Sequence, residues 1–521
     1  MNRRDVIKLT GAAAWGLVPS AAASALQAHE GTAAPAERHS RTVEQHSGTV
    51  ERWGIFEAAF NGPASGNPFV DAQLSAHFRH QNRVLRVSGF YDGRGVYRIR
   101  FMPDQPGEWS YTTESNVGAL NNLSGTFQCS AASQGNHGPV EVNGGRHFSY
   151  ADGTPFFPFG TTCYAWVHQT EALQQQTLKT LAAAPFTKIR MCVFPKSYEY
   201  NQNEPPLYPF PRKDGQNDLS TFNVDFFQHF ERRIGDLNRL GIQADLILFH
   251  PYDRWGYASM PADANDRYLR YVVARFSAYR NVWWSLANEY DFIKSKTSAD
   301  WDRFARIVQD EDAAHHLRSI HHGRVMYDYS RQWVTHASLQ TDDFSKTKQW
   351  FMDWNKPIIF DECKYEGNIP SRWGNLSGEE MTRRFWLAVI NGCYATHGET
   401  YLDPNDVLWW SKGGELHGTS PERIAFLRRI AEQSKGFGWT AVDNASYLSA
   451  TSGGDAILLY YFDYHQLAEY EFKLPEGGSY KAELIDPWKM TITPVEGLHQ
   501  AKAKLKLPGR PYQAVRFVKA E

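Results

Sequence analysis

After its first residues the sequence lacks a long hydrophobic run, because no later segment reaches the roughly 20 apolar residues of a membrane-spanning helix. It also has little net charge: 55 Lys and Arg stand against 57 Asp and Glu, a formal charge of -2. This balance provides no long-range attraction for nucleic acid or an anionic membrane. Five cysteines without a CxxC pair indicate neither a disulfide framework nor a structural zinc site.

The first 28 residues have the features of an export signal. Arg3 and Arg4 begin the run RRDVIK, which resembles a twin-arginine motif, and an apolar stretch follows over residues 9–18. That stretch is too short to span a bilayer, and small residues suitable for cleavage come after it. We therefore predict a removable signal peptide over residues 1–28, a flexible linker over residues 29–47, and a periplasmic or secreted protein. An unprocessed N-terminal helix is the alternative.

Three regions with different patterns follow the linker. Residues 48–135 contain short runs of alternating apolar and polar residues with turns such as PDQPG between them, and predict a β-sandwich. Residues 136–436 alternate between apolar strand-like runs and amphipathic helical stripes, which is typical of βαβ units. Residues 437–521 return to short strands and predict a second β-sandwich.

The central region contains eight strand candidates, which favours a (β/α)8 TIM barrel. They cover residues 156–162, 186–194, 244–249, 282–287, 317–321, 333–338, 357–360 and 395–401. A doubly wound open sheet is the alternative, but no glycine-rich nucleotide loop follows an early strand. The predicted fold class is therefore α/β, a (β/α)8 barrel flanked by N-terminal and C-terminal β-sandwich domains.

The fourth and seventh strand candidates each end in a glutamate. Glu289 follows the apolar run VWWSLA and Asn288, and Glu362 follows KPIIF and Asp361. In a TIM barrel, residues just past the carboxyl ends of the strands face the active site. Two carboxylates that flank one bond are what glycosidases use, one as acid and one as nucleophile or base.

Other readings of these carboxylates stay open. Asp361 competes with Glu362, because strand alternation turns only one of two adjacent side chains into the pocket, and we favour Glu362. Glu289 would otherwise be a carboxylate that caps the next helix. Asn203 and Glu204 repeat the Asn-Glu pair in a polar, proline-rich loop. No strand end precedes this pair, so the pair alone does not indicate a catalytic residue.

Asn288 and Glu289 after a fourth strand, with Glu362 after a seventh, resemble the retaining glycosidases of clan GH-A. The runs FYDG and YRIRFMP, at residues 90–93 and 97–103, resemble the β-sandwich that precedes apiosidase-like barrels. The run DGTPFFPFGTT at residues 152–162 resembles the opening strand of those barrels. This resemblance implies a retaining double displacement on a glycan or glycoside, with Glu362 as nucleophile and Glu289 as acid/base.

The resemblance also implies substrate-binding positions. Arg190 matches the second-strand arginine that keeps the nucleophile ionised, and Asn288 is expected to contact the sugar hydroxyl next to the reacting carbon. His250 and Tyr252 come just after the third strand candidate, and His336 lies in the sixth. The full set of predicted binding residues is Arg190, Asn288, His250, Tyr252, His336, Trp409 and Trp410, the last two as alternatives for the sugar platform after the eighth strand.

The expected partner is a carbohydrate, an oligosaccharide or polysaccharide, and neither a cofactor nor a metal ion is predicted. One alternative is a carbohydrate-binding barrel without turnover, and another is a transglycosidase that uses the same carboxylates. A third is a metal-dependent barrel hydrolase, because His250, His321 and His336 lie at or near predicted strand ends. These histidines lack the close paired spacing of a typical ligand set.

Overall fold

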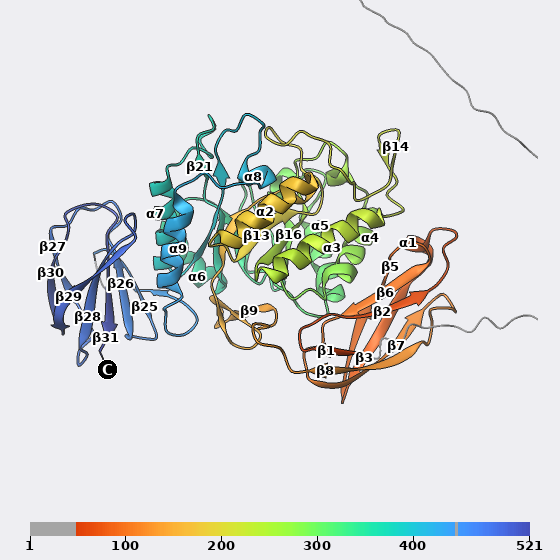
Figure 1. Ribbon diagram of the computed structural model, residues 1–521, viewed down its shortest axis with the longest axis horizontal. Coiled ribbons are helices and arrows are strands. Elements are labelled where there is room, and N and C mark those ends of the chain that lie inside the picture. Colours follow the sequence, from red (N-terminus) through yellow and green to blue (C-terminus); the bar gives the residue numbers. More distant parts are fainter. Residues whose placement is uncertain (1–47, 443–445, 521) are drawn as a thin grey trace, which may run out of the picture. The chain divides into compact units, whose positions relative to one another are not determined.

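The structure is a computed structural model that describes residues 48–442 and 446–520. The predicted signal peptide and linker lie outside the described residues. Figure 1 shows the described elements in sequence colours. None of the helices in this described part is long and apolar enough to cross a membrane.

The N-terminal region forms two sheets. Strands β1, β8, β7, β3 and β4 make the larger sheet, and β2, β6 and β5 the smaller one. Apolar and polar residues alternate along β7, and Trp109 and Tyr111 point into the core between the sheets. The elements are β1 Thr49–Glu51, β2 Phe56–Asn61, α1 Pro68–Asp71, β3 Leu74–His80, β4 Arg83–Ser88, β5 Phe90–Tyr91, β6 Val96–Phe101, β7 Gly107–Ser115 and β8 Ser124–Ser130.

Eight parallel strands form the central barrel in the order β18-β17-β16-β13-β12-β22-β20-β19. They are β12 Phe159–Thr162, β13 Lys188–Cys192, β16 Gln243–Phe249, β17 Val282–Ala287, β18 Arg318–Ser319, β19 Ala337–Gln340, β20 Ile358–Glu362 and β22 Tyr394–His397. A parallel bridge between His321 and Ser338 brings the edge strands β18 and β19 together. The predicted TIM barrel is confirmed.

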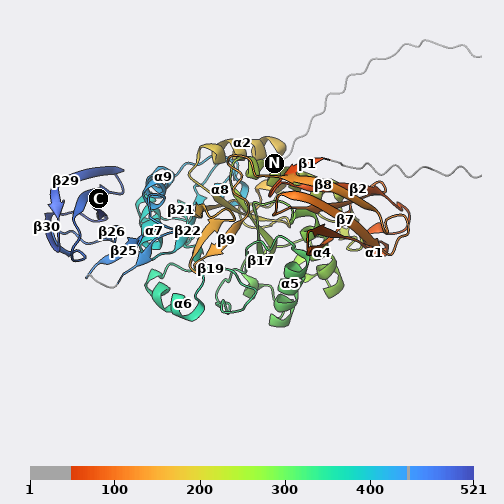
Figure 2. The same ribbon diagram turned by 90° about the horizontal axis from the view of Figure 1, so that it is seen from below.

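Amphipathic helices surround the barrel strands (Figures 1 and 2). They are α2 Glu171–Ala183, α3 Val224–Arg239, α4 Ala262–Phe276, α5 Ser298–Glu311, α6 Thr347–Trp354, α7 Gly378–Ile390 and α9 Ser420–Ala431. In α3, Phe226, Phe230, Ile234 and Leu237 form the buried stripe that packs toward the sheet. Thr297 is the N-cap of α5 and forms a capping box with Asp300.

Shorter elements connect these strands and helices. A small antiparallel sheet of β9 Val140–Asn143, β10 His147–Tyr150 and β11 Pro155–Phe156 precedes the barrel. The other short elements are η1 Trp166–His168, β14 Arg212–Lys213, β15 Gln216–Asn217, η2 Tyr257–Ser259, η3 Tyr290–Phe292, η4 Phe344–Lys346, β21 Glu366–Gly367, β23 Glu399–Thr400 and α8 Trp409–Lys412. Several of them follow carboxyl ends of barrel strands and shape the site described below.

The C-terminal region forms a six-stranded sheet and a two-stranded sheet. The strands are β24 Thr440–Ala441, β25 Leu448–Ser452, β26 Ile457–Tyr461, β27 Glu469–Lys473, β28 Tyr480–Asp486, β29 Thr491–His499, β30 Lys502–Lys506 and β31 Ala514–Lys519. Tyr461 of β26 stacks on Trp386 of α7 with ring centres 5.3 Å apart, so this sheet packs on a barrel helix.

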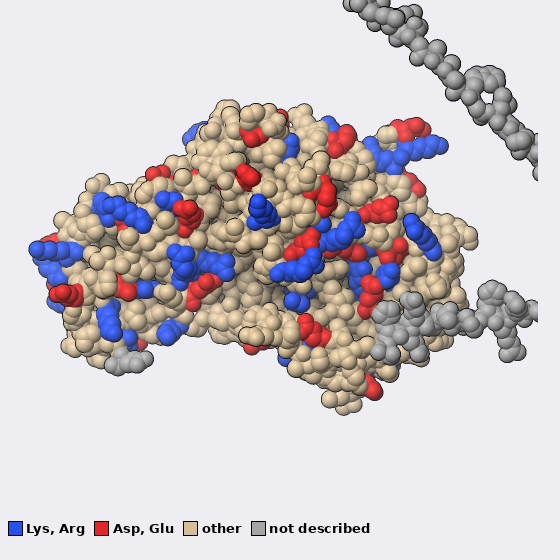
Figure 3. Space-filling model, viewed as in Figure 1, with Lys and Arg blue, Asp and Glu red and all other residues tan. Residues whose placement is uncertain are grey.

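The surface of the protein carries charges of both signs, and its cysteines are buried. Basic and acidic side chains are interspersed on the face shown in Figure 3, as a near-neutral chain predicts. All five cysteines are buried free thiols. They act as small apolar core residues and not as disulfide partners.

Candidate active site

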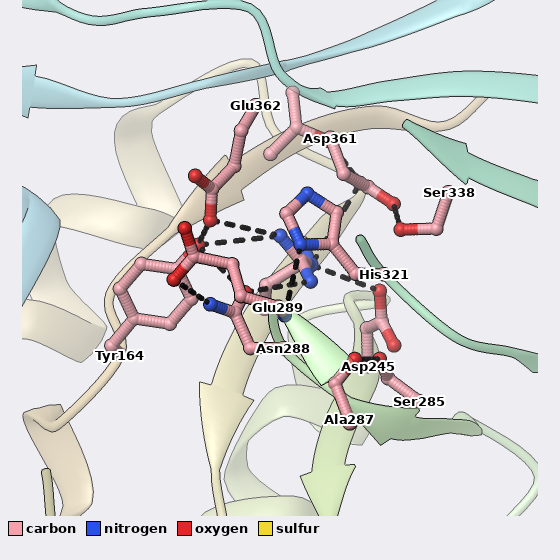
Figure 4. A network of polar contacts seen from close by, with 12 residues as sticks. Tyr164, Asp245, Ser285, Ala287, Asn288, Glu289, His321, Ser338, Asp361 and Glu362 are labelled. Atoms are coloured by element: carbon pink, nitrogen blue, oxygen red, sulfur yellow. Dashed lines mark hydrogen bonds and ion pairs between the residues drawn. The ribbon is translucent and has the colours of Figure 1, made fainter. Parts of the chain in front are cut away.

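The two predicted glutamates lie at the carboxyl ends of their strands and share one pocket. Glu362 is the last residue of β20, and Glu289 comes two residues after β17. Both side chains line a pocket of about 480 Å³. Figure 4 shows their carboxylates on the same side of a network of polar contacts.

Glu289 is held in an uncommon backbone conformation. Its φ angle is 49°, in the left-handed region that costs a non-glycine residue free energy and is often found at functional sites. The sharp turn ends the strand and directs the side chain across the pocket. There Oε2 accepts hydrogen bonds from the Tyr252 hydroxyl and, at 3.1 Å, from Nδ2 of Asn288.

Glu362 is surrounded by groups that stabilise its charge. Oε1 accepts a hydrogen bond from the Tyr164 hydroxyl and lies 3.6 Å from Nη1 of Arg190. Burial, and then the nearby charge of Glu289, raise the pKa of Glu362 to about 7, while Arg190 acts in the opposite direction. Burial and a neighbouring carboxylate thus favour the protonated form of Glu362.

Asp361 points away from the pocket into the barrel core. Its carboxylate accepts hydrogen bonds from Nζ of Lys188 at 2.7 Å and from Oγ of Ser338 at 2.6 Å, as Figure 4 shows for Ser338. Lys188 also binds Asp245 at 2.9 Å. Burial opposes the ionisation of Asp361, but Lys188 and Arg190 hold its pKa below the usual range. Asp361 is thus a charged core residue without access to a ligand.

Arg190 and Asn288 lie behind the two glutamates. Nη2 of Arg190 donates to Oδ1 of Asn288 at 3.2 Å, and Nη1 donates to the Tyr164 hydroxyl at 3.3 Å. Neither Arg190 nor Asn288 lines the pocket, and both are buried. The structure thus brings them into contact with the residues that we expect to react, but not to the surface of the pocket.

An ammonium group enclosed by aromatic rings lies beside the glutamates. Nζ of Lys196 is 3.7 Å from the ring centre of Tyr164, 4.5 Å from that of Tyr252 and 4.8 Å from that of Trp410. Lys196 is 3 % exposed, and burial lowers its pKa. Among the described residues its ammonium makes no hydrogen bond and no ion pair, so its donors are free to bind a ligand in the pocket.

Of the remaining predicted binding residues, Tyr252 and Trp410 line the pocket. The structure decides between the two tryptophans after the eighth strand. Trp410 packs near Trp373 with ring centres 5.0 Å apart, whereas Trp409 donates its indole N–H to Oγ1 of Thr161 at 2.8 Å inside the barrel. Trp410 and the half-buried Trp373 are therefore the indole rings available to a sugar.

The structure corrects the expectation for two histidines. His250 is buried, donates from Nε2 to the Phe194 carbonyl at 3.2 Å, and does not line the pocket. His336 precedes β19, and its ring packs against Trp283 at the start of β17. It therefore lies at the amino ends of the barrel strands, opposite the glutamates. Burial lowers the pKa of each histidine to about 3, so both are neutral core residues.

The histidines of the metal-hydrolase alternative are not grouped as ligands. Within residues 48–442 and 446–520, the one group of three or more His, Cys, Asp or Glu side chains with metal-binding spacing is Glu366, His397 and Glu399. His250, His321 and His336 are not part of it. His321 instead accepts a hydrogen bond at Nδ1 from the backbone N–H of Glu289 at 3.4 Å.

Sequence reasoning missed several pocket residues. They are Lys196, Tyr198, Phe292, Gly323, Arg324, Gln340, Thr341, Asp342, Lys364, Tyr365 and Trp373. Most follow strand ends, where a TIM barrel forms its site, and this position is the signal that could have indicated them. Lys196 comes four residues after β13 ends at Cys192. Tyr252 likewise comes three residues after β16 ends at Phe249.

Residues 142–438, which include the whole barrel, match the family model of the apiosidase-like catalytic domain. This protein belongs to the apiosidase-like family. Two domains of unknown function flank the apiosidase-like domain, DUF5060 over residues 49–116 and DUF5605 over residues 445–518. A comparison with curated proteins gave no match.

Solved structures similar to this apiosidase-like protein are glycoside hydrolases. One, from Bacteroides vulgatus ATCC 8482 and provisionally assigned as a glycoside hydrolase, is 40% identical with a TM-score of 0.87 and covers 91% of this chain and 100% of its own. A family 5 glycoside hydrolase from the same organism shares the fold at 16% identity and a TM-score of 0.58, covering 74% and 93% of the two chains. The apiosidase-like protein is thus an O-glycosyl hydrolase.

Proposed function

We propose that this enzyme cleaves a glycosidic bond with retention of configuration, with Glu362 as nucleophile and Glu289 as acid/base. The observation that carries the proposal is that both carboxylates line one pocket and have different partners. Arg190 and Tyr164 contact Glu362, and they stabilise a negative charge. Asn288 and Tyr252 contact Glu289 without a cation within ion-pair distance in the described chain.

In the first step, a carboxylate oxygen of Glu362 forms a bond to the anomeric carbon as the bond to the leaving oxygen breaks. Glu289 gives its proton to that oxygen. In the second step, Glu289 takes a proton from water, the water oxygen bonds to the anomeric carbon, and the Glu362 carboxylate leaves. The mechanism needs one proton on the pair at the start, and the raised pKa of Glu362 beside Glu289 fits a pair that shares one proton.

The substrate is a carbohydrate that fits between the glutamates and the aromatic residues. Trp410 and Trp373 offer flat apolar faces for a sugar ring. The Lys196 ammonium would donate hydrogen bonds to oxygens of the same sugar, because its donors have no partner in the described part of the chain.

Export by the twin-arginine route would place the enzyme in the periplasm or outside the cell. We expect the double substitution Arg3→Lys and Arg4→Lys to leave the enzyme in the cytoplasm.

A substitution at Glu362 tests the enzyme mechanism. The wild-type protein is screened against plant and microbial glycans and aryl glycosides, and the best substrate is then used with Glu362→Gln. We expect kcat to fall by at least about 10³-fold, because the amide cannot attack carbon, while binding persists. Glu204→Gln is the matched control, since it makes the same change of side chain in an exposed loop that does not line the pocket. Full turnover by Glu362→Gln would reject the proposal, and product analysis separates hydrolysis from transglycosylation.

A further inference from the structure

A second cluster of ionisable side chains lies outside the glycosidase pocket. Glu366 is in β21, Glu399 is in β23, and the two residues are directly opposite in the parallel pairing of these strands. His397 ends β22 two residues before Glu399. All three side chains are almost completely buried, and none lines the pocket of Glu289 and Glu362.

The two carboxylates of this cluster are fixed by four consecutive backbone N–H groups and, at Glu366, also by the hydroxyls of Tyr401, Thr419 and Ser420. Those of His417 and Gly418 donate to Glu399 at 2.5 and 2.8 Å, and those of Thr419 and Ser420 donate to Glu366 at 2.7 and 3.1 Å. No lysine or arginine of the described chain forms an ion pair with either carboxylate. Two buried acids therefore lie together without a cationic side chain to balance them.

The histidine of the cluster has one nitrogen bound and one free. Nδ1 of His397 lies 3.3 Å from Oγ1 of Thr161, which also accepts the indole N–H of Trp409. Nε2 is buried and has no hydrogen-bond partner in the described residues. An unsatisfied buried ring nitrogen is costly, so it points to a missing partner. Metal-binding histidines are held in this way, with the second ring nitrogen bonded to a neighbouring group.

We propose that Glu366, His397 and Glu399 bind a divalent transition-metal ion of the Zn²⁺ or Mn²⁺ type. One potential ligand atom from each residue lies within 4.8 Å of the other two, so small side-chain movements suffice to close the set around an ion. An imidazole with two carboxylates suits such ions, whereas Ca²⁺ and Mg²⁺ prefer sites made only of oxygen atoms. The backbone N–H groups then serve as outer hydrogen bonds that orient the carboxylates.

The role of the proposed ion is structural. The site is buried, and its ligands join the segment after β20, the end of β22 and, through the backbone of residues 417–420, the start of α9. Tyr365, next to Glu366, lines the glycosidase pocket, so the ion would hold one wall of that pocket in place. This inference does not depend on the proposed reaction, because metal content and folding are measured without any glycoside.

Elemental analysis of the full-length protein, purified without chelator or metal-affinity resin, tests the proposal. We expect about one transition-metal ion per chain in the wild type and at least a tenfold lower content in His397→Gln and Glu399→Gln. His168→Gln is the matched control, because His168 is also buried with one unpaired ring nitrogen but is not part of the cluster. It keeps the metal. Equal metal content in the wild type and both cluster variants would overturn the proposal.

Refolding covers the case in which a cluster variant does not fold. The wild-type protein is unfolded in urea with a chelator, freed of metal and refolded with Zn²⁺, Mn²⁺, Ca²⁺, Mg²⁺ or no ion. We expect Zn²⁺ or Mn²⁺ to raise Tm by several degrees relative to the metal-free sample, because an ion that binds only the folded state stabilises it. If the metal-free wild type folds and its Tm does not respond to Zn²⁺ or Mn²⁺, the metal site is rejected. The two carboxyl groups would then share a proton instead.

Discussion

Nη1 of Arg190 lies 3.6 Å from Oε1 of Glu362, whereas Glu289 forms no ion pair within the described residues. This one pair makes two chemically similar glutamates different. Burial and the charge of Glu289 raise the pKa of Glu362, and the positive charge of Arg190 opposes that rise and so favours the ionised form that a nucleophile requires. We therefore propose Glu362 for the attack and Glu289 for the proton transfer.

The loss of rate in Glu289→Ala is expected to depend on the leaving group of the substrate. Loss of the general acid slows cleavage of poor leaving groups by about 10²–10⁴-fold, while a dinitrophenyl leaving group departs without a proton. Azide then replaces water in the second step and gives a glycosyl azide of the same anomeric configuration as the substrate. Rate measurements and NMR of the product check this result. An equal loss of rate for all leaving groups would argue against Glu289 as the acid.

Glu362→Gln is expected to be more stable than the wild type at high pH. The folded pKa of Glu362 is about 7 and its ordinary value is 4.5, so the folded state favours the protonated form. The contribution of this group is complete below pH 4.5 and is lost as the pH rises through 7. A gain of about 1–3 kcal/mol in the free energy of unfolding is expected at pH 8, and a smaller gain at pH 5. Urea denaturation at the two pH values measures it, and a gain that is larger at pH 5 contradicts it.

Lys196→Met is expected to weaken substrate binding. A charge-assisted hydrogen bond contributes about 1.5–3 kcal/mol, so KM rises roughly 10- to 100-fold if the ammonium binds a sugar oxygen in the ground state. Lys364→Met is the comparison, because Lys364 lines the same pocket but is already paired with Asp342 at 2.6 Å. Steady-state kinetics of both variants decide the point. Equal effects of the two substitutions would show that Lys196 has no special role.

Lys188→Met is expected to destabilise the barrel. Lys188 is fully buried and lies 2.7 Å from Asp361 and 2.9 Å from Asp245, so its loss leaves two buried carboxylates with less compensation. Breaking such a network costs about 3–5 kcal/mol. The midpoint of urea denaturation measures the change, with the exposed Lys213→Met as control. A loss below about 1 kcal/mol would mean that the network is not a major source of stability.

The sequence was sufficient to predict the barrel because its strands are long apolar runs between amphipathic helices. The fourth strand candidate, residues 282–287, agrees with β17 at both ends. The sixth was placed at residues 333–338, but β19 covers Ala337–Gln340. Trp333 and Val334 are buried, yet they precede the strand, since burial alone does not separate strand from connection in a short apolar run. This shift put His336 near the site in the prediction.

The pocket itself could be predicted only in part. Strand ends indicated Glu289, Glu362, Tyr252 and Trp410, because a local pattern marks where each strand stops. Lys196 also follows a strand end, but its position in the sequence does not show that aromatic rings enclose its ammonium. The rings around its ammonium come from the segments after three other strands, and only the closed barrel brings them together. The same holds for Glu366 and Glu399, which are far apart in sequence and adjacent in the structure.

Covalent trapping tests the central claim most directly. The wild-type enzyme is incubated with the 2-deoxy-2-fluoro dinitrophenyl glycoside of its preferred sugar, digested and analysed by mass spectrometry. The mechanism predicts one sugar attached through an ester to Glu362, and release of that sugar with retained configuration. A sugar on Asp361 or Glu289, or direct formation of the inverted product without an adduct, would contradict the mechanism.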